Sequence, residues 1–151
     1  MAKIENKNEF KKKLLWLLPS FLWFLMTIKL LLTVSPVDGD SFLLNLPYGD
    51  KIGHFGIFGI LTASLMFSLC GGKFFNNERK PIVTTVLIII FSWGMLTEIL
   101  QGVLLDAREG DVWDFVADAS AGVMGIYCYE LLHKIVNKVP IYNFKRIEHP
   151  L

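Results

Sequence analysis

The chain of 151 residues has few cysteines, almost no net charge and none of the short motifs that mark common functional sites. Its two cysteines, Cys70 and Cys128, lack a metal-binding spacing, and its formal net charge is +1. No basic stripe with interleaved aromatic residues is present, so no nucleic-acid partner is expected. Internal repeats, low-complexity tracts and EF-hand, H-E-x-x-H or P-loop motifs are also absent from the sequence. What remains is a set of long apolar runs and the charges that interrupt them.

Hydrophobic residues make up 53% of the chain, which is high for a soluble protein. A bilayer core of about 30 Å requires roughly 20 apolar residues in a helix. Four runs approach this length: 14–34, 52–70, 82–101 and 112–132. The first run is apolar almost all round rather than striped, which disfavours the alternative of a soluble helical bundle. We therefore predict an all-α fold, a four-helix transmembrane bundle.

The basic residues gather on one side of this predicted bundle. All Lys and Arg residues except Lys29, Lys51 and Arg108 lie before the first run, between the second and third, or after the fourth. The positive-inside rule makes these segments, and so both termini, cytoplasmic, in the cytoplasmic (inner) membrane. We expect a cytoplasmic N-terminal segment (1–13), a membrane domain (14–133, with its motifs in 50–127) and a cytoplasmic tail (134–151). A signal peptide is the alternative for the first run, but the run is long for one and no A-x-A cleavage site follows.

The second run begins with a group of polar residues at the opposite, outer side. Asp50 and Lys51 are four and three residues before His54, so the three share a helix face. Next to Asp50, His54 is suited to act as an acid or a base, and a purely structural histidine is the alternative. No Ser or Cys stands beside His54 in sequence, so nucleophilic catalysis gains no support.

Acidic residues also enter the third and fourth runs. Glu98 sits about one turn inside its helix, where a carboxylate needs a partner within the bundle, and Gln101 shares its face. Asp111, Asp114 and Asp118 follow an i, i+3, i+7 spacing, which places them on one helix face. A helix cap is the alternative role for Asp111.

Arg108 lies three residues before Asp111 and is the expected counter-ion of these acids. Small residues in the second and fourth predicted helices predict close helix packing. They are Gly53, Gly56, Gly59 and Ala63 in the second helix, and Ala121, Gly122 and Gly125 in the fourth.

The predicted outer end carries a formal charge of −4 when all its groups are ionised. The groups counted are Asp50, Glu98, Asp106, Glu109, Asp111, Asp114, Asp118, Lys29, Lys51 and Arg108. Such a site favours a metal cation, an amine or a zwitterion over a bare anion. With Glu98, Asp114 and Asp118 as candidate ligands, an oxygen-rich site fits Mg²⁺ or Ca²⁺ better than Zn²⁺.

The stretches DKIGHFGIFGIL, TEILQ and REGDVWDFVADASAG resemble the VanZ-like family of small integral membrane proteins. The family pattern falls on Asp50, Lys51, His54, Glu98, Gln101, Arg108, Asp114, Asp118 and Gly122. Asp118 departs from the pattern, in which Asn is common at this position. The family is named for a protein linked to resistance against a glycopeptide antibiotic, so the resemblance implies action at the outer membrane face on cell-envelope precursors or lipids.

Three classes of function follow. The first is a binding protein that holds a zwitterionic lipid headgroup or a lipid-linked envelope precursor, with Asp50, Lys51, Gln101, Arg108, Asp111 and Asp114 as ligand-binding residues. The second is a metal-assisted enzyme acting on a lipid-linked phosphate, with His54, Glu98 and Asp118 as catalytic residues. The third is a small transporter or proton relay through Glu98, Asp118 and Lys29.

Overall fold

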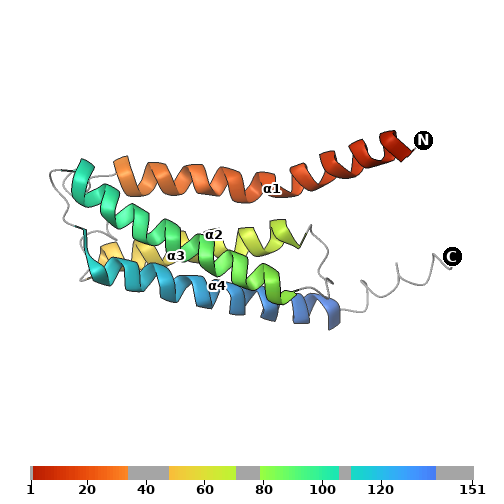
Figure 1. Ribbon diagram of the computed structural model, residues 1–151. Coiled ribbons are helices and arrows are strands. Elements are labelled where there is room, and N and C mark those ends of the chain that lie inside the picture. The colour runs from red at the N-terminus through yellow and green to blue at the C-terminus, as the bar shows by residue number, and fades with distance from the viewer. Residues whose placement is uncertain (1, 34–47, 71–78, 106–109, 139–151) are drawn as a thin grey trace.

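The computed structural model describes residues 2–33, 48–70, 79–105 and 110–138, which are almost entirely helical. Its helices are α1 (Ala2–Thr33), α2 (Gly49–Leu69), α3 (Arg79–Leu104) and α4 (Val112–Lys138), and they run lengthwise beside one another (Figure 1). No strand occurs in these described ranges. The predicted all-α, four-helix architecture is confirmed.

Each helix is long and apolar enough to cross a membrane. The spans by length and composition are Leu14–Leu32, Gly49–Leu69, Lys80–Leu104 and Val112–Val136. Large apolar side chains face outward along these spans; Leu15 is 67% exposed and Val103 is 75% exposed. Helices with internally paired backbones and apolar exteriors are what a bilayer accepts, so the fold indicates a multi-pass membrane protein.

All four helices extend beyond the runs expected from hydropathy, α1 and α4 by the most at a single end. α1 begins at Ala2, within the segment expected to precede the membrane, and α4 continues to Lys138. Lys and Glu in these flanks are good helix formers, so the helices continue where the apolar runs stop. The start of α1 and the end of α4 lie at the same end of the bundle (Figure 1).

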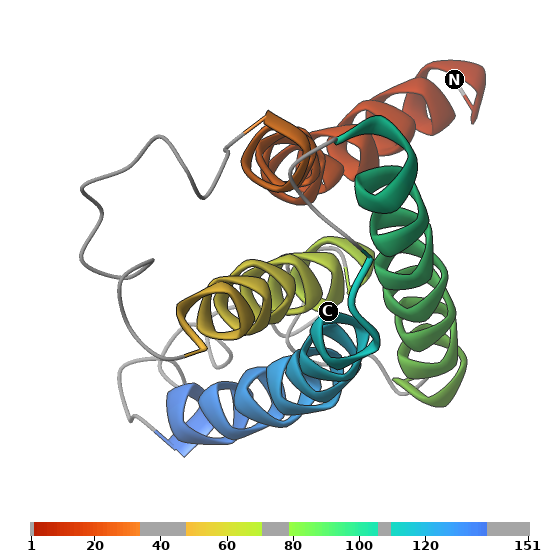
Figure 2. The ribbon, with the colours of Figure 1, turned by 90° about the vertical axis from the view of Figure 1, so that its left-hand side faces the viewer.

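The helices pack in unequal pairs. α2 packs most extensively on α4, whereas α1 contacts α2 and α3 but not α4 within the described ranges. Figure 2 shows α1 and α4 on opposite sides of the bundle, with α2 and α3 between them. The first turns of α2 and α4 and the last turns of α3 therefore come together at one end.

Small residues on α4 allow this close approach. A Cβ at Gly125 would lie 2.8 Å from the carbonyl oxygen of Gly59, and a Cβ at Gly122 would lie 2.8 Å from Ile90 Cγ2. The predicted packing role of these two glycines is confirmed. Gly59 of α2 takes part in this contact through its carbonyl oxygen, but for Gly53 and Gly56 the same prediction is wrong, because an added Cβ there meets no described neighbour within 4 Å.

Two side-chain hydrogen bonds to backbone carbonyl oxygens hold α1 against α2 and α3. Trp23 Nε1 donates to the carbonyl oxygen of Ile57 at 2.9 Å, which ties α1 to α2. Gln101 Nε2 donates to the carbonyl oxygen of Leu31 at 2.9 Å, which ties α1 to α3. Such bonds are valuable in an apolar setting, where an unpaired polar group is costly.

Candidate functional site

Three ionisable side chains from three helices meet inside the bundle at the end where α2 and α4 begin. His54 comes from α2, Glu98 from α3 and Asp118 from α4. One ligand atom from each lies within 4.8 Å of the other two. We call this group the buried triad. Its residues are 2%, 9% and 1% exposed, respectively, so the surrounding helices shield it from solvent.

The histidine of the buried triad contacts both carboxylates. His54 Nδ1 lies 3.0 Å from Asp118 Oδ1, which is a hydrogen bond when that nitrogen carries the proton. The same nitrogen lies 3.7 Å from Glu98 Oε1, within ion-pair range if the ring is charged. His54 therefore pairs with Asp118 on another helix, and not with Asp50 on its own helix as the sequence spacing predicts.

Two carboxylate oxygens of the buried triad have no hydrogen-bond partner among the described residues. They are Glu98 Oε1 and Asp118 Oδ2. An unpaired polar atom in a dry setting costs about 1–3 kcal/mol, and more when it is charged. Gly94 leaves room for the aspartate, since a Cβ there would lie 3.2 Å from Asp118 Oδ2. The buried triad thus has acceptor capacity that the described part of the protein does not use.

A second group of charges lies nearer the helix ends. Lys51 Nζ donates to Asp111 Oδ2 at 2.7 Å, to Asp114 Oδ1 at 3.0 Å and to Asp50 Oδ2 at 3.2 Å. We call these four residues the Lys51 cluster. An ammonium has three N–H donors, and here each has a carboxylate. The hydrogen bond from Lys51 lowers the pKa of Asp111, which lies outside the membrane spans.

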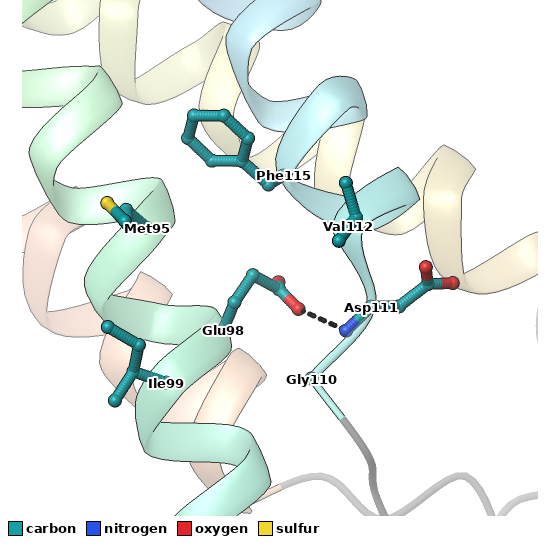
Figure 3. A pocket seen from close by; sticks show the side chains of 7 residues that line it. All are labelled: Met95, Glu98, Ile99, Gly110, Asp111, Val112 and Phe115. Carbon is teal, nitrogen blue, oxygen red and sulfur yellow. Dashed lines mark hydrogen bonds between the residues drawn. The ribbon is translucent and has the colours of Figure 1, made fainter.

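The N-terminus of α4 joins the two groups. Asp111 Oδ1 accepts a hydrogen bond from the Trp113 N–H at 2.9 Å, so the predicted capping role of Asp111 is confirmed. The backbone N–H of Asp111 donates to Glu98 Oε2 at 2.9 Å (Figure 3). A Cβ at Gly110 would lie only 2.7 Å from the carbonyl oxygen of Glu98. Glycine at this position is therefore what lets the chain pass so close to α3.

A pocket of about 370 Å³ opens between α3 and α4 beside Glu98. Its walls are mostly apolar and are formed by Met95, Glu98, Ile99, Gly110, Asp111, Val112 and Phe115 (Figure 3). Met95, Ile99 and Val112 are 61%, 54% and 74% exposed. The pocket therefore opens on the apolar flank of the bundle, and the Glu98 carboxylate borders both the pocket and the buried triad.

The sequence-predicted residues separate into distinct positions. Gln101 lies in the contact with α1, as described above, instead of at the ligand site. Asp114, a candidate metal ligand, directs Oδ1 at Lys51, and His54 stands with Glu98 and Asp118 in its place. Arg108, with Asp106 and Glu109, lies outside the described residues. The counter-ion observed for Asp111 and Asp114 is Lys51.

Sequence reasoning missed two features of this end. The lateral pocket has a signal in hindsight, because Met95 and Ile99 are four residues apart on the Glu98 side of α3. Gly110 also escaped notice, because a glycine in a connection between helices is too common to indicate a close backbone contact.

Comparison with known proteins assigns no activity to this arrangement. No family model matches the chain, and no solved structure matches it. The chain is similar to an uncharacterized protein of Schizosaccharomyces pombe, with 28% identity over 124 residues that cover 78% of this chain and 73% of that protein. The resemblance to the VanZ-like family stays a prediction.

Proposed function

We propose that this protein, which resembles the VanZ-like family, binds the headgroup of a zwitterionic membrane lipid or lipid-linked precursor. The observation that carries the proposal is the pocket between α3 and α4, whose apolar walls run up to the Glu98 carboxylate. An amphiphile suits such a pocket, because its acyl chain packs on apolar side chains while its polar group reaches an acceptor. The same opening gives a lipid lateral access from the bilayer.

The charges at this end favour a headgroup that contains a cationic part. The described carboxylates at this end are Asp50, Glu98, Asp111, Asp114 and Asp118, and the ammonium of Lys51 pairs with three of them. Since each N–H of that ammonium already has a carboxylate partner, Lys51 offers no free donor to a phosphate. Asp50 and Asp111, with side chains 43% and 37% exposed, are accessible to an amine.

The site faces outward from the cytoplasmic membrane in this proposal. Support comes from the start of α1 and the end of α4, which lie together at the end of the bundle opposite the site (Figure 1). Basic residues flank both of these helix ends, as the positive-inside rule requires of a cytoplasmic side. A cytoplasmic reporter fused after Leu151 should be active, and one inserted at Gly39 should be silent.

Photoreactive lipids test the proposal directly. We expect a phosphatidylethanolamine analogue with a photoreactive acyl chain to label peptides of α3 and α4 that line the pocket. Ile99→Trp fills the pocket and should lower this labelling several-fold. Ile88→Trp is the matched control, because Ile88 is a similarly exposed isoleucine of α3 (61%) outside the pocket. Equal labelling of both variants would refute lipid binding in the pocket.

A second candidate function, a metal-assisted enzyme acting on a lipid-linked phosphate, is favoured by the contact between His54 and Asp118. A carboxylate that holds Nδ1 of a histidine orients the ring and leaves Nε2 to accept or donate a proton. Turnover of a lipid-linked phosphate that requires a divalent cation and is abolished in His54→Gln would favour this function. Binding without turnover would leave the headgroup-binding function alone.

A further inference from the structure

We infer that the buried triad is a binding site for a divalent transition-metal ion, with His54, Glu98 and Asp118 as its protein ligands. The inference goes beyond lipid binding, because it needs no lipid in the pocket. It differs from the sequence-based expectation in both the ligand set and the metal. Its basis is the geometry of the three side chains, their unused oxygen atoms and the burial of their charges.

The spacing of the ligand atoms suits a small cation. Zn²⁺ binds nitrogen and oxygen ligands at about 2.0–2.1 Å, so tetrahedral ligand atoms lie about 3.3 Å apart. His54 Nδ1 is 3.0 Å from Asp118 Oδ1 and 3.7 Å from Glu98 Oε1, values that lie on either side of this separation. Small side-chain shifts would therefore place all three atoms around one ion.

The unused oxygens indicate that the described residues alone do not complete this group. Asp118 is 1% exposed, yet its Oδ2 atom has no hydrogen-bond partner among the described residues, and the same holds for Glu98 Oε1. Carboxylate charge removed from water is costly unless it is paired. A divalent cation would supply two positive charges beside these carboxylates.

Comparison with the Lys51 cluster limits the candidate metal ligands to His54, Glu98 and Asp118. Asp50, Asp111 and Asp114 already share the ammonium of Lys51, so a metal is not needed to balance them. The described side chains that contact the buried triad include no lysine or arginine, and the backbone N–H of Asp111 is directed at Glu98 Oε2. One histidine and two carboxylates therefore form the ligand set.

This ligand set selects the kind of metal. Imidazole suits zinc and other first-row transition metals, whereas Mg²⁺ and Ca²⁺ prefer sites made of oxygen ligands. The expectation of Mg²⁺ or Ca²⁺ assumed three carboxylate ligands, Glu98, Asp114 and Asp118. Because Asp114 is bonded to Lys51, only the other two remain as ligands. Three protein ligands leave a coordination position open for water or for an oxygen atom of a bound molecule. Zn²⁺ and Mn²⁺ are accordingly the probes of choice.

The test uses the full-length protein in lipid-free detergent micelles, stripped with EDTA and titrated with Zn²⁺ or Mn²⁺ alone. We expect saturable binding of one ion per chain. His54→Gln, Glu98→Gln and Asp118→Asn should each weaken the affinity by more than the about 10- to 100-fold typical of losing an outer-shell partner. The matched controls are His133→Gln and Glu130→Gln, near the other end of α4, and they should bind as the wild type does.

A spectroscopic readout keeps the inference open to refutation even if the triad variants fold poorly. Pulsed electron paramagnetic resonance of bound Mn²⁺ should show coupling to one imidazole nitrogen in the wild-type protein. Absence of that coupling, absence of saturable binding, or equal loss of binding in His133→Gln would each overturn the inference. The outcome of lipid photolabelling is independent of the outcome of the metal titration. The titration contains no lipid, and the photolabelling can be repeated after EDTA treatment.

Discussion

The buried triad and the Lys51 cluster are built from the same kinds of residue at the same end of the bundle, yet they differ in how far the protein satisfies them. In the Lys51 cluster, each N–H of one ammonium has a carboxylate within 2.7–3.2 Å. In the buried triad, two carboxylates share one imidazole nitrogen, and one oxygen of each has no hydrogen-bond partner among the described residues. Acidic residues thus hold the helices together in one place and leave binding capacity in the other.

Burial follows the same division. Lys51, Asp111 and Asp50 keep 22%, 37% and 43% of their side chains exposed, so water lowers the cost of their charges. Asp114 is the exception in the Lys51 cluster, with 12% of its side chain exposed, and it is paired with Lys51. The triad residues are almost fully buried, where charge is costly unless it is paired. A protein that leaves its most costly charges incompletely paired indicates a site kept for a ligand rather than for stability, a pattern expected of functional sites.

Removal of the ammonium should have the largest effect on stability. Lys51→Met leaves the three carboxylates of the Lys51 cluster without their cation at the contact between α2 and α4. Breaking a buried pair typically costs about 3–5 kcal/mol, and we expect a loss of about 2–3 kcal/mol here because Asp50 and Asp111 are partly exposed. Thermal unfolding in detergent, followed by circular dichroism, measures the loss. Lys51→Arg keeps the charge and should stay close to wild type, and an unchanged midpoint in Lys51→Met would contradict the structural role of this cluster.

A methyl group added at Gly110, between the Lys51 cluster and the buried triad, should have the next largest effect on stability. In Gly110→Ala the new Cβ would lie 2.7 Å from the carbonyl oxygen of Glu98, a backbone atom that cannot turn away. The chain must shift, which weakens the bond from the Asp111 N–H to Glu98 Oε2, and we expect a loss of about 1–2 kcal/mol from overpacking. Gly56→Ala is the control, because its Cβ meets no described neighbour within 4 Å. Equal stability of the two variants would show that the close contact is not needed.

Neutralising the aspartate of the buried triad should have a smaller effect of the opposite sign. In EDTA, Asp118→Asn keeps an oxygen for His54 and removes an incompletely paired buried charge, so we expect a gain of up to about 1 kcal/mol. Asp114→Asn should instead lose stability, because its carboxylate has a partner in Lys51. Zn²⁺ should raise the unfolding temperature of the wild type but not that of Asp118→Asn. Loss of stability in both variants would remove the distinction between the two clusters.

The sequence predicts the helices and the end of the bundle where the charges lie, but not the partners of those charges. Long apolar runs are sufficient for the four spans, because a bilayer sets the helix length. The sequence also predicts how deep the charged residues lie in the bundle: Glu98 and Asp118 stand inside apolar runs, and both are buried. A carboxylate at that depth needs a partner within the bundle, which the sequence predicts without identifying His54 as that partner.

The choice of partner depends on how the helices are rotated against one another, which spacing along a single helix does not contain. Spacing within α2 pairs His54 with Asp50, whereas the approach of α4 places Asp118 beside His54 and directs Lys51 at Asp111 and Asp114. The predicted packing role of Gly53 and Gly56 in α2 failed for the same reason. The spacing shows that the small residues share one face of α2, but tertiary packing decides which helix covers that face.

The smallest effect that separates the two clusters is a pH dependence carried by Asp111. The Lys51 ammonium, assisted by the Trp113 N–H, holds the pKa of Asp111 below its ordinary value of 3.8. Because the folded-state pKa is the lower one, the stabilisation is complete above about pH 5 and is lost as the pH falls through 3.8 towards the folded-state value. Asp111→Asn retains the helix cap and removes the titrating charge. Its unfolding temperature should therefore lie below that of the wild type at pH 6, and the two should converge in acid. A difference that persists unchanged down to pH 3 would show that the charge of Asp111 does not contribute to the Lys51 cluster.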